Sequence, residues 1–187
     1  GKTGPEWHEP SRPARVEAEG VHHLATFAEL TGAHVYAVHT SCGEAIDVAR
    51  AAQARGVKLW VESVIPHFAL DHTLAEQAKF QGAKYVMSPP LRDRSNHDAL
   101  WAALASGVTS TVGTDHAPFD FNGQKDMGKG DFTKIPNGIP SIQERIDLLH
   151  TLGVKTGRID LNTFVRVAST NAAQIFGLKC KGTIAVG

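Results

Sequence analysis

Two residues, His39 and Asp115, have side chains that can bind metal ions and move protons, and each ends a predicted strand. His39 follows the apolar run at 35–38, and Asp115 follows the Val- and Thr-rich run at 108–114. Taken alone, the histidine could be hydrogen-bonded to a loop carbonyl, and the aspartate could cap nearby amides. Both side chains would emerge at the same rim of a parallel sheet. Their convergence favours a metal site with a carboxylate that also shuttles a proton.

These two ligands supply only half of such a site. Catalytic zinc generally takes three protein ligands and a water, and a two-metal site needs more. The sequence has no His-x-His, HExxH or CxxC motif. His67 and His72 are further candidates, and His116 could contact groups near Asp115. The other histidines are predicted to lie in loops or on solvated helix faces: His8, His22, His23, His34, His97 and His150.

Strand-like and helix-like segments alternate along the chain, which is typical of parallel βαβ units. We expect strands at 35–38, 57–63, 84–87 and 108–114, and the start of another at 183–186. We expect helices at 14–31, 44–55, 73–80, 95–106, 141–152 and 160–176. Ligands bind beyond the carboxyl ends of such strands. The polar residues at those ends would share one face: His39, Glu62, Ser63, Ser88, Asp115 and His116.

Three helix starts carry capping signals. Thr73 with Glu76 and Ser141 with Glu144 have the spacing of capping boxes, and Asp160 is expected to cap the last helix. In the last two helices we expect these apolar side chains to face the core: Ile142, Ile146, Leu149, Leu152, Phe164, Val167, Ala168, Ile175 and Phe176.

The composition excludes several classes of protein. The 187 residues carry 19 basic and 19 acidic side chains, and this zero net charge offers no basic surface for nucleic acid or an anionic membrane. No apolar run approaches the ~20 residues that cross a bilayer, and no secretory signal opens the chain. Cys42 and Cys180 cannot form a disulfide framework or a thiolate zinc site, which indicates a reducing, cytoplasmic setting.

Two loops could bind a ligand. The segment at 117–140 is long for a compact domain, so it is either functional or disordered. Pro89 and Pro90 stiffen the turn after Ser88, which makes either a structural corner or a rigid backbone that binds a polar ligand. Asn137-Gly138 could be merely a turn. No phosphate-binding glycine motif is present.

Several motifs resemble the dihydropyrimidinase/D-hydantoinase branch of the amidohydrolase superfamily, in family order over essentially the whole chain. They are GPE at 4–6, HEPSRP at 8–13, VHTSC at 38–42, SPPLR at 88–92, GTDHAPF at 113–119, GKGDFTKIPNG at 128–138, STNAA at 169–173 and KGTIAVG at 181–187. The motif at 128–138 is the most specific, because related dihydroorotases and allantoinases differ there.

The resemblance implies an α/β fold that is part of a (β/α)8 TIM barrel, with roughly strands six to eight and their helices present. A whole barrel takes ~250 residues, and the chain begins at Gly1 without an initiator Met. We therefore expect a piece of a longer enzyme, without the N-terminal half and the β-sandwich. Residues 1–178 would belong to the barrel, and residues 179–187 would start a strand of the C-terminal β-sandwich.

The resemblance also implies roles for four residues. His39 would end strand six and bind the second of two divalent metal ions, which are expected to be zinc. Asp115 would end strand eight, bind the first ion and act as general base and then acid. The main-chain groups of Ser88 and Asn137 would hold a cyclic imide. The carboxylated lysine that bridges the metals lies outside this chain, and His67 stands where many relatives have Tyr.

The implied enzyme opens dihydropyrimidines or 5-substituted hydantoins to N-carbamoyl amino acids, by attack of a metal-bridging hydroxide. It would take a small cyclic imide or ureide, would bind neither nucleic acid nor membrane, and would form a homotetramer in pyrimidine catabolism. Two alternatives remain open: an allantoinase or dihydroorotase, and a non-catalytic hydantoinase-like scaffold protein. The motif at 128–138 argues against the first, and the retained His39 and Asp115 argue against the second. The chain alone is expected to be inactive.

Overall fold

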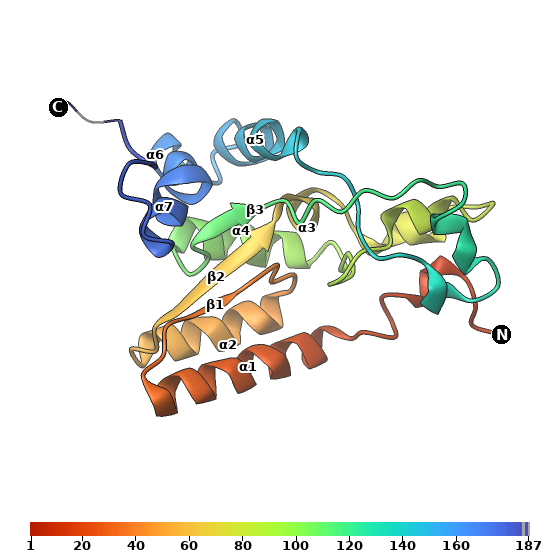
Figure 1. Ribbon diagram of the computed structural model, residues 1–187, viewed down its shortest axis with the longest axis horizontal. Helices are drawn as coiled ribbons and strands as arrows, with labels where there is room; N and C mark the ends of the chain where they lie inside the picture. Colours follow the sequence, from red (N-terminus) through yellow and green to blue (C-terminus); the bar gives the residue numbers. More distant parts are fainter. Residues whose placement is uncertain (185, 187) are drawn as a thin grey trace.

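A parallel sheet of three strands lies at the centre of the computed structural model, which describes residues 1–184 and 186 (Figure 1). The strands β1 (Val35–Ala37), β2 (Leu59–Val64) and β3 (Thr111–Gly113) follow the spatial order β1-β2-β3. Ala37 is level with Val61, and Val64 is level with Gly113. The carboxyl ends of all three strands therefore meet at one edge of the sheet.

Helices α1 (Ala14–Thr31), α2 (Gly43–Ala54) and α4 (Asn96–Ser106) pack on one face of this sheet. Side chains alternate along a strand, so β2 sends Leu59 and Val61 into this core, together with residues of all three helices. The predicted boundaries of α1 are confirmed: it begins after Pro13 and ends at Gly32, whose φ of 70° is easy only for glycine.

The opposite face of the sheet is sparsely covered within the described chain. Trp60 is 41% exposed and Val38 is 48% exposed. Helix α7 (Asn171–Ile175) reaches this face, where the ring of Phe176 contacts the ring of Tyr36 at 5.3 Å. The remaining α-helices are α3 (Ile65–Ala69), α5 (Glu144–Leu149) and α6 (Leu161–Val165), with π-helical turns at His150–Val154 and Arg166–Thr170.

The irregular segments gather at the side of the molecule where the N-terminus lies, to the right in Figure 1. They carry short 3₁₀ helices at Pro5–Trp7, His72–Glu76, Gln81–Tyr85, Lys125–Gly128 and Phe132–Lys134. Two small apolar clusters stabilise this region: one contains Met87, Leu91 and Ile139, and the other contains Val86 and Ile135. The long loop before α5 is therefore packed and ordered, so the alternative of a disordered segment at 117–140 is wrong.

Two predicted elements in this region are wrong. The segment at 84–87 is not a strand, because a 3₁₀ helix runs to Tyr85 and the next two residues are buried in the apolar clusters. A short apolar run fits either kind of burial. The helix expected at 73–80 is only the 3₁₀ turn His72–Glu76. Its cap is Asp71, whose carboxylate accepts a hydrogen bond from the Thr73 amide at 3.0 Å.

Two predictions for the C-terminal part also need correction, and a third is confirmed. Helix α5 begins at Glu144 and Ser141 does not cap it, because the Ser141 hydroxyl donates to the Thr114 carbonyl at 2.6 Å. The expected apolar stripe is incomplete, with Ile142 62% exposed and Phe176 60% exposed. The Asp160 cap is confirmed by a 2.7 Å bond from the Thr163 amide.

The strand expected at 183–186 is not present at residues 183 and 184, and Ala185 lies outside the described residues. In the part of the chain that the structure describes, no helix combines the length and the apolar character needed to cross a bilayer.

Candidate active site at the carboxyl edge of the sheet

His39 lies two residues beyond the end of β1 with its backbone in the left-handed region, at a φ of 41°. Its amide donates to the Glu62 carboxylate at 3.3 Å, which helps to hold this conformation. The imidazole is half-exposed and makes no hydrogen bond to any described residue. Left-handed backbone is costly for a residue with a side chain and is often retained at functional sites. His39 therefore offers a free nitrogen ligand.

Asp115 has the same local geometry at the end of β3. It lies two residues beyond Gly113 and has a φ of 46°. Its carboxylate is exposed and has neither a hydrogen bond nor an ion pair among the described residues, so it caps no helix. The described chain has four non-glycine residues with positive φ, and His39 and Asp115 are two of them.

The register of the sheet places these two residues at the same edge, on either side of β2. Adjacent strands are about 4.8 Å apart, so the ends of β1 and β3 lie roughly 10 Å apart. Donors that bind different ions of a metal pair stand up to about 8 Å apart, since each bond is about 2.1 Å and the ions are about 4 Å apart. If the side chains of His39 and Asp115 point toward each other, their donor atoms would come close enough to bind such a pair of ions.

The described residues contain no cluster of three or more His, Cys, Asp and Glu side chains that could hold a metal ion. His67 and His72 therefore do not complete a site around His39 or Asp115. The two donors fit part of a metal centre, and the remaining ligands would have to come from other residues.

Glu62 supports the edge between the two donors. Its carboxylate accepts a hydrogen bond from the Tyr36 hydroxyl at 2.9 Å, and that hydroxyl lies 2.6 Å from the Thr111 hydroxyl. Since Tyr36 donates to Glu62, it accepts from Thr111. Burial raises the pKa of Tyr36, so the phenol stays protonated. A Cβ at Gly113 would stand 2.8 Å from the Glu62 carboxylate, so a side chain there would displace that carboxylate.

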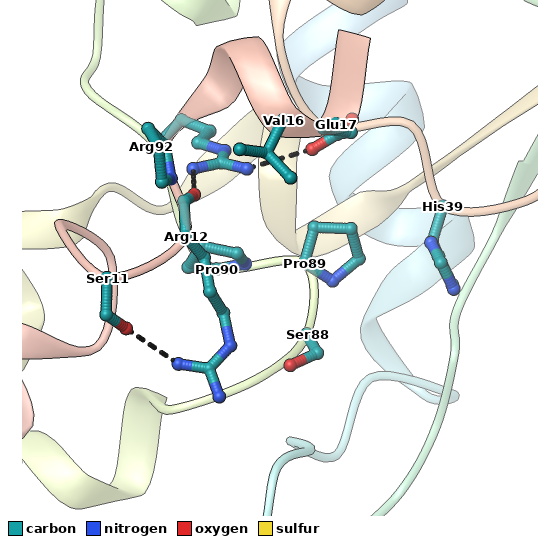
Figure 2. A pocket seen from close by; sticks show the side chains of 10 residues that line it. Ser11, Arg12, Val16, Glu17, His39, Ser88, Pro89, Pro90 and Arg92 are labelled. Atoms are coloured by element: carbon teal, nitrogen blue, oxygen red, sulfur yellow. Dashed lines mark hydrogen bonds and ion pairs between the residues drawn. The ribbon is translucent and has the colours of Figure 1, made fainter. Parts of the chain in front are cut away.

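A hollow of about 390 Å³ lies beside His39, and Ser88 lines it (Figure 2). Figure 2 shows the imidazole of His39 to the right of Pro89 and the side chain of Ser88 below Pro89, with no hydrogen bond from His39 to the other residues drawn. The structure therefore brings two predicted site residues, from segments 49 positions apart in sequence, to one cavity.

Arg92 ties the loop after Ser88 to the first helix. Its guanidinium is 4% exposed and forms 3.0 Å ion pairs with both Glu9 and Glu17. It also donates to the Ser41 hydroxyl at 3.1 Å and to the Arg12 carbonyl. Figure 2 shows Arg92 between the loop and α1. Sequence analysis missed this role, because the four partners lie 51 to 83 residues away in the chain.

Two buried histidines bind backbone carbonyls of the same loop. Nε2 of His8 donates to the Met87 carbonyl at 2.7 Å, and Nε2 of His67 lies 3.2 Å from the Pro89 carbonyl. Burial lowers the pKa of each imidazole to about 4, so both are neutral. His8 lies in a turn outside the helices, in line with its predicted place in a loop, and it is buried there at 3% exposure.

His116 supports the chain beyond Asp115. Its Nδ1 accepts hydrogen bonds from the amides of Ser141 and Ile142 at 3.0 and 3.3 Å. Nδ1 is therefore unprotonated, and the ring positions the segment before α5.

Asn137 is exposed, and its neighbour Gly138 links it to the Ser88 segment. The Gly138 amide donates to the Val86 carbonyl at 3.0 Å. The φ of Gly138 is 146°, and a Cβ there would stand 2.5 Å from the Ala117 carbonyl oxygen, so a side chain is excluded. The two predicted imide-binding segments thus lie side by side, against the same end of the sheet.

Known proteins resemble this chain in sequence and in fold. The sequence model of the amidohydrolase family matches residues 14–187. The D-hydantoinase of Geobacillus stearothermophilus is 46% identical over 188 residues, which cover 100% of this chain and 40% of that protein. The structure of a D-hydantoinase (dihydropyrimidinase) from Thermus sp. is 61% identical, with a TM-score of 0.96 over 100% of this chain and 41% of that one.

The dihydropyrimidinase structure from Brevibacillus agri gives a TM-score of 0.97 at 45% identity, over 99% of this chain and 40% of that one. This chain therefore spans about two fifths of the length of the relatives that it matches.

Proposed function

Because the chain belongs to the amidohydrolase family, we propose that the protein containing it is a metal-dependent cyclic amidohydrolase. It would open the ring of dihydropyrimidines or 5-substituted hydantoins to N-carbamoyl amino acids. One observation carries the proposal: two unpartnered donors, His39 and Asp115, follow parallel strands at one edge of the sheet. The printed names of the relatives, D-hydantoinase and dihydropyrimidinase, support the substrate class.

In this proposal the three strands are strands six to eight of a (β/α)8 barrel. The exposed face that carries Trp60 and Val38 supports the assignment, because the inner face of a barrel is filled by side chains from its other strands. Residues 1–178 would form the C-terminal half of the barrel, and residues 179–187 would start a strand of a β-sandwich.

His39 and Asp115 would hold the second and first of two divalent metal ions. An imidazole and a carboxylate are donors that zinc accepts, and further ligands would include a carboxylated lysine from elsewhere in the protein. When bound, the ions would lower the pKa of a water molecule and polarise the amide carbonyl.

Asp115 would move the proton in this reaction. Its free carboxylate would accept the proton of the attacking water and deliver it to the leaving ring nitrogen, which would otherwise depart as a poor anion. No described residue competes for this carboxylate through a hydrogen bond or an ion pair.

The main-chain groups of Ser88 and Asn137 would hold the ring imide. His8, His67 and Arg92 support the Ser88 loop, so its backbone would be rigid before a ligand arrives. Such preorganisation saves the entropy of ordering the loop on binding. The family resemblance further favours a homotetramer, and the two free cysteines, Cys42 and Cys180, are compatible with a cytoplasmic setting.

A panel of cyclic amides tests the proposal on the full-length protein loaded with zinc. The ring opening of hydantoin, 5-substituted hydantoins and dihydrouracil is monitored by the loss of ultraviolet absorbance. Allantoin and dihydroorotate are measured as the competing candidate substrates, here called the competitors. We expect turnover of the first group to exceed that of the competitors by at least about 100-fold in kcat/KM. Preference for a competitor would assign the protein to that branch. No turnover and no bound metal would favour the scaffold alternative.

A further inference from the structure

Lys125 is buried in the loop before α5, although lysine is rarely buried without a partner of opposite charge. Only 2% of the residue is exposed. Within the described part of the chain, no carboxylate lies within ion-pair distance of its ammonium group. Burial lowers the pKa of Lys125 to about 8. Keeping this side chain inside the protein therefore costs free energy, which its hydrogen bonds must offset.

Those hydrogen bonds go to two backbone carbonyls from different segments. Nζ of Lys125 donates to the carbonyl of Val86 at 2.7 Å and to the carbonyl of Pro136 at 2.7 Å. Val86 lies two residues before Ser88, and Pro136 directly precedes Asn137. The lysine thus bridges the two segments that carry the proposed imide-binding groups.

In the described chain, the two segments share one backbone–backbone hydrogen bond, which is weaker than the bonds that Lys125 makes. The Gly138 amide donates to the same Val86 carbonyl at 3.0 Å. Without Lys125, that single hydrogen bond between neutral groups would remain beside the apolar clusters that contain Val86 with Ile135 and Met87 with Ile139, and the Pro136 carbonyl would lose the Lys125 donor. Charge-assisted bonds of the kind that Lys125 makes are roughly twice as strong as neutral ones.

We propose that Lys125 is a positioning residue for the substrate, which fixes the spacing between the backbone groups of Ser88 and Asn137 by binding the carbonyls of Val86 and Pro136. It touches neither the reacting atoms nor the metal ligands. This inference rests on the proposed function, because it takes a cyclic imide as the molecule that the two segments hold.

The test replaces Lys125 with methionine, which keeps the length and the apolar stem but removes every donor. Lys134→Met in the same loop is the matched control, because the Lys134 side chain is 69% exposed and pairs only with Asp131 among the described residues. Both variants are made in the full-length zinc-loaded protein. Amide hydrogen exchange is measured at residues 86–88, at Asn137 and Gly138, and in α4, and KM and kcat are measured for hydantoin and dihydrouracil.

In Lys125→Met we expect faster exchange at 86–88 and at Asn137 and Gly138, with α4 unchanged. We also expect a KM raised by roughly tenfold, since one lost charge-assisted contact is worth about that factor. The kcat and the bound zinc should stay within about twofold of wild type, and Lys125→Arg, which retains donors, should recover part of the affinity.

Unchanged exchange at both segments would overturn the inference, and so would an unchanged KM in an active protein. Failure of both Lys125 variants to fold would assign the lysine to stability and would also overturn it. If the wild-type protein opens neither ring, the proposed function fails, while the exchange experiment still decides whether Lys125 ties the two segments.

Discussion

At the scale of single residues, the backbone conformation distinguishes His39 and Asp115 from the rest of the sheet edge. Both have positive φ, which costs roughly 1–3 kcal/mol for a residue other than glycine. A glycine would remove that cost at either position. Because the free side chains make no bonds to described residues, stability does not explain why His and Asp occupy these positions, and the proposed metal site does.

Asp115→Asn tests the role of the carboxylate. The amide keeps the shape but cannot accept a proton, so we expect kcat on hydantoin to fall by at least about 1,000-fold. Since Asp115 is exposed and unpaired, the unfolding midpoint of the metal-free protein should stay within about 2 °C of wild type. Steady-state kinetics and thermal denaturation measure the two effects.

Asp120→Asn is the matched control, because Asp120 is an exposed carboxylate in the same segment. It should retain wild-type kcat. Near-normal turnover in Asp115→Asn would remove Asp115 from the mechanism.

The residues of the site were predictable to different degrees. His39 and Asp115 could be found from the sequence, because polar residues directly after apolar strands identify the carboxyl edge of a parallel sheet. Lys125 and Arg92 could not. Their partners are backbone carbonyls and carboxylates from distant segments, and these contacts arise only when the loops pack together.

At the scale of elements, Arg92 connects the loop before α4 with the start of α1 and the segment after β1. Glu17, one of its partners, is 14% exposed on its side chain. Removing one member of a buried ion pair leaves the other charge without compensation.

Arg92→Met should therefore lower the free energy of unfolding by about 3–5 kcal/mol, measured by urea denaturation of the full-length protein. Arg94→Met is the control, because Arg94 is exposed two residues further along and has no ion pair among the described residues. It should change the free energy by less than about 0.5 kcal/mol. Equal effects of the two substitutions would show that the buried network contributes little.

The elements themselves were predicted well where one signal dominated. Helix α1 has an apolar face, a proline before it and a glycine after it, and its predicted limits are confirmed. The segment at 84–87 was wrongly predicted as a strand. Its apolar residues are buried in small clusters under the loops, and a four-residue apolar run does not distinguish such a loop from a strand. At Ser141 the capping pattern was present, but the hydroxyl bonds Thr114 instead.

At the scale of the whole molecule, helices cover one face of the sheet, and the other face is largely uncovered within the described chain. The helices bury one face in the main core, whereas Trp60 and Val38 remain exposed on the other. Together with the two-fifths coverage of the relatives, this asymmetry supports our proposal that further strands close a barrel over the open face.

Acid should destabilise the molecule through His8. Its pKa is about 4 in the folded chain against 6.5 for a free imidazole. Between these values the unfolded chain binds more protons, so the stability is complete above pH 6.5 and is lost as the pH falls toward 4. The loss should be about 3 kcal/mol.

His8→Gln separates this contribution from other titrating groups, because the amide can still donate to the Met87 carbonyl but does not titrate. Urea denaturation from pH 7 to pH 4.5 should give a stability curve that is shallower in the variant, by up to about 1.4 kcal/mol per pH unit. Parallel curves would show that His8 is not held neutral by the fold.

Anomalous diffraction at the zinc edge, from crystals of the full-length protein, tests the shared metal site of His39 and Asp115 most directly. We predict two peaks about 4 Å apart, one about 2.1 Å from a ring nitrogen of His39 and the other about 2.1 Å from a carboxylate oxygen of Asp115. Peaks bound to other residues, or none in a zinc-saturated and active protein, would contradict the account.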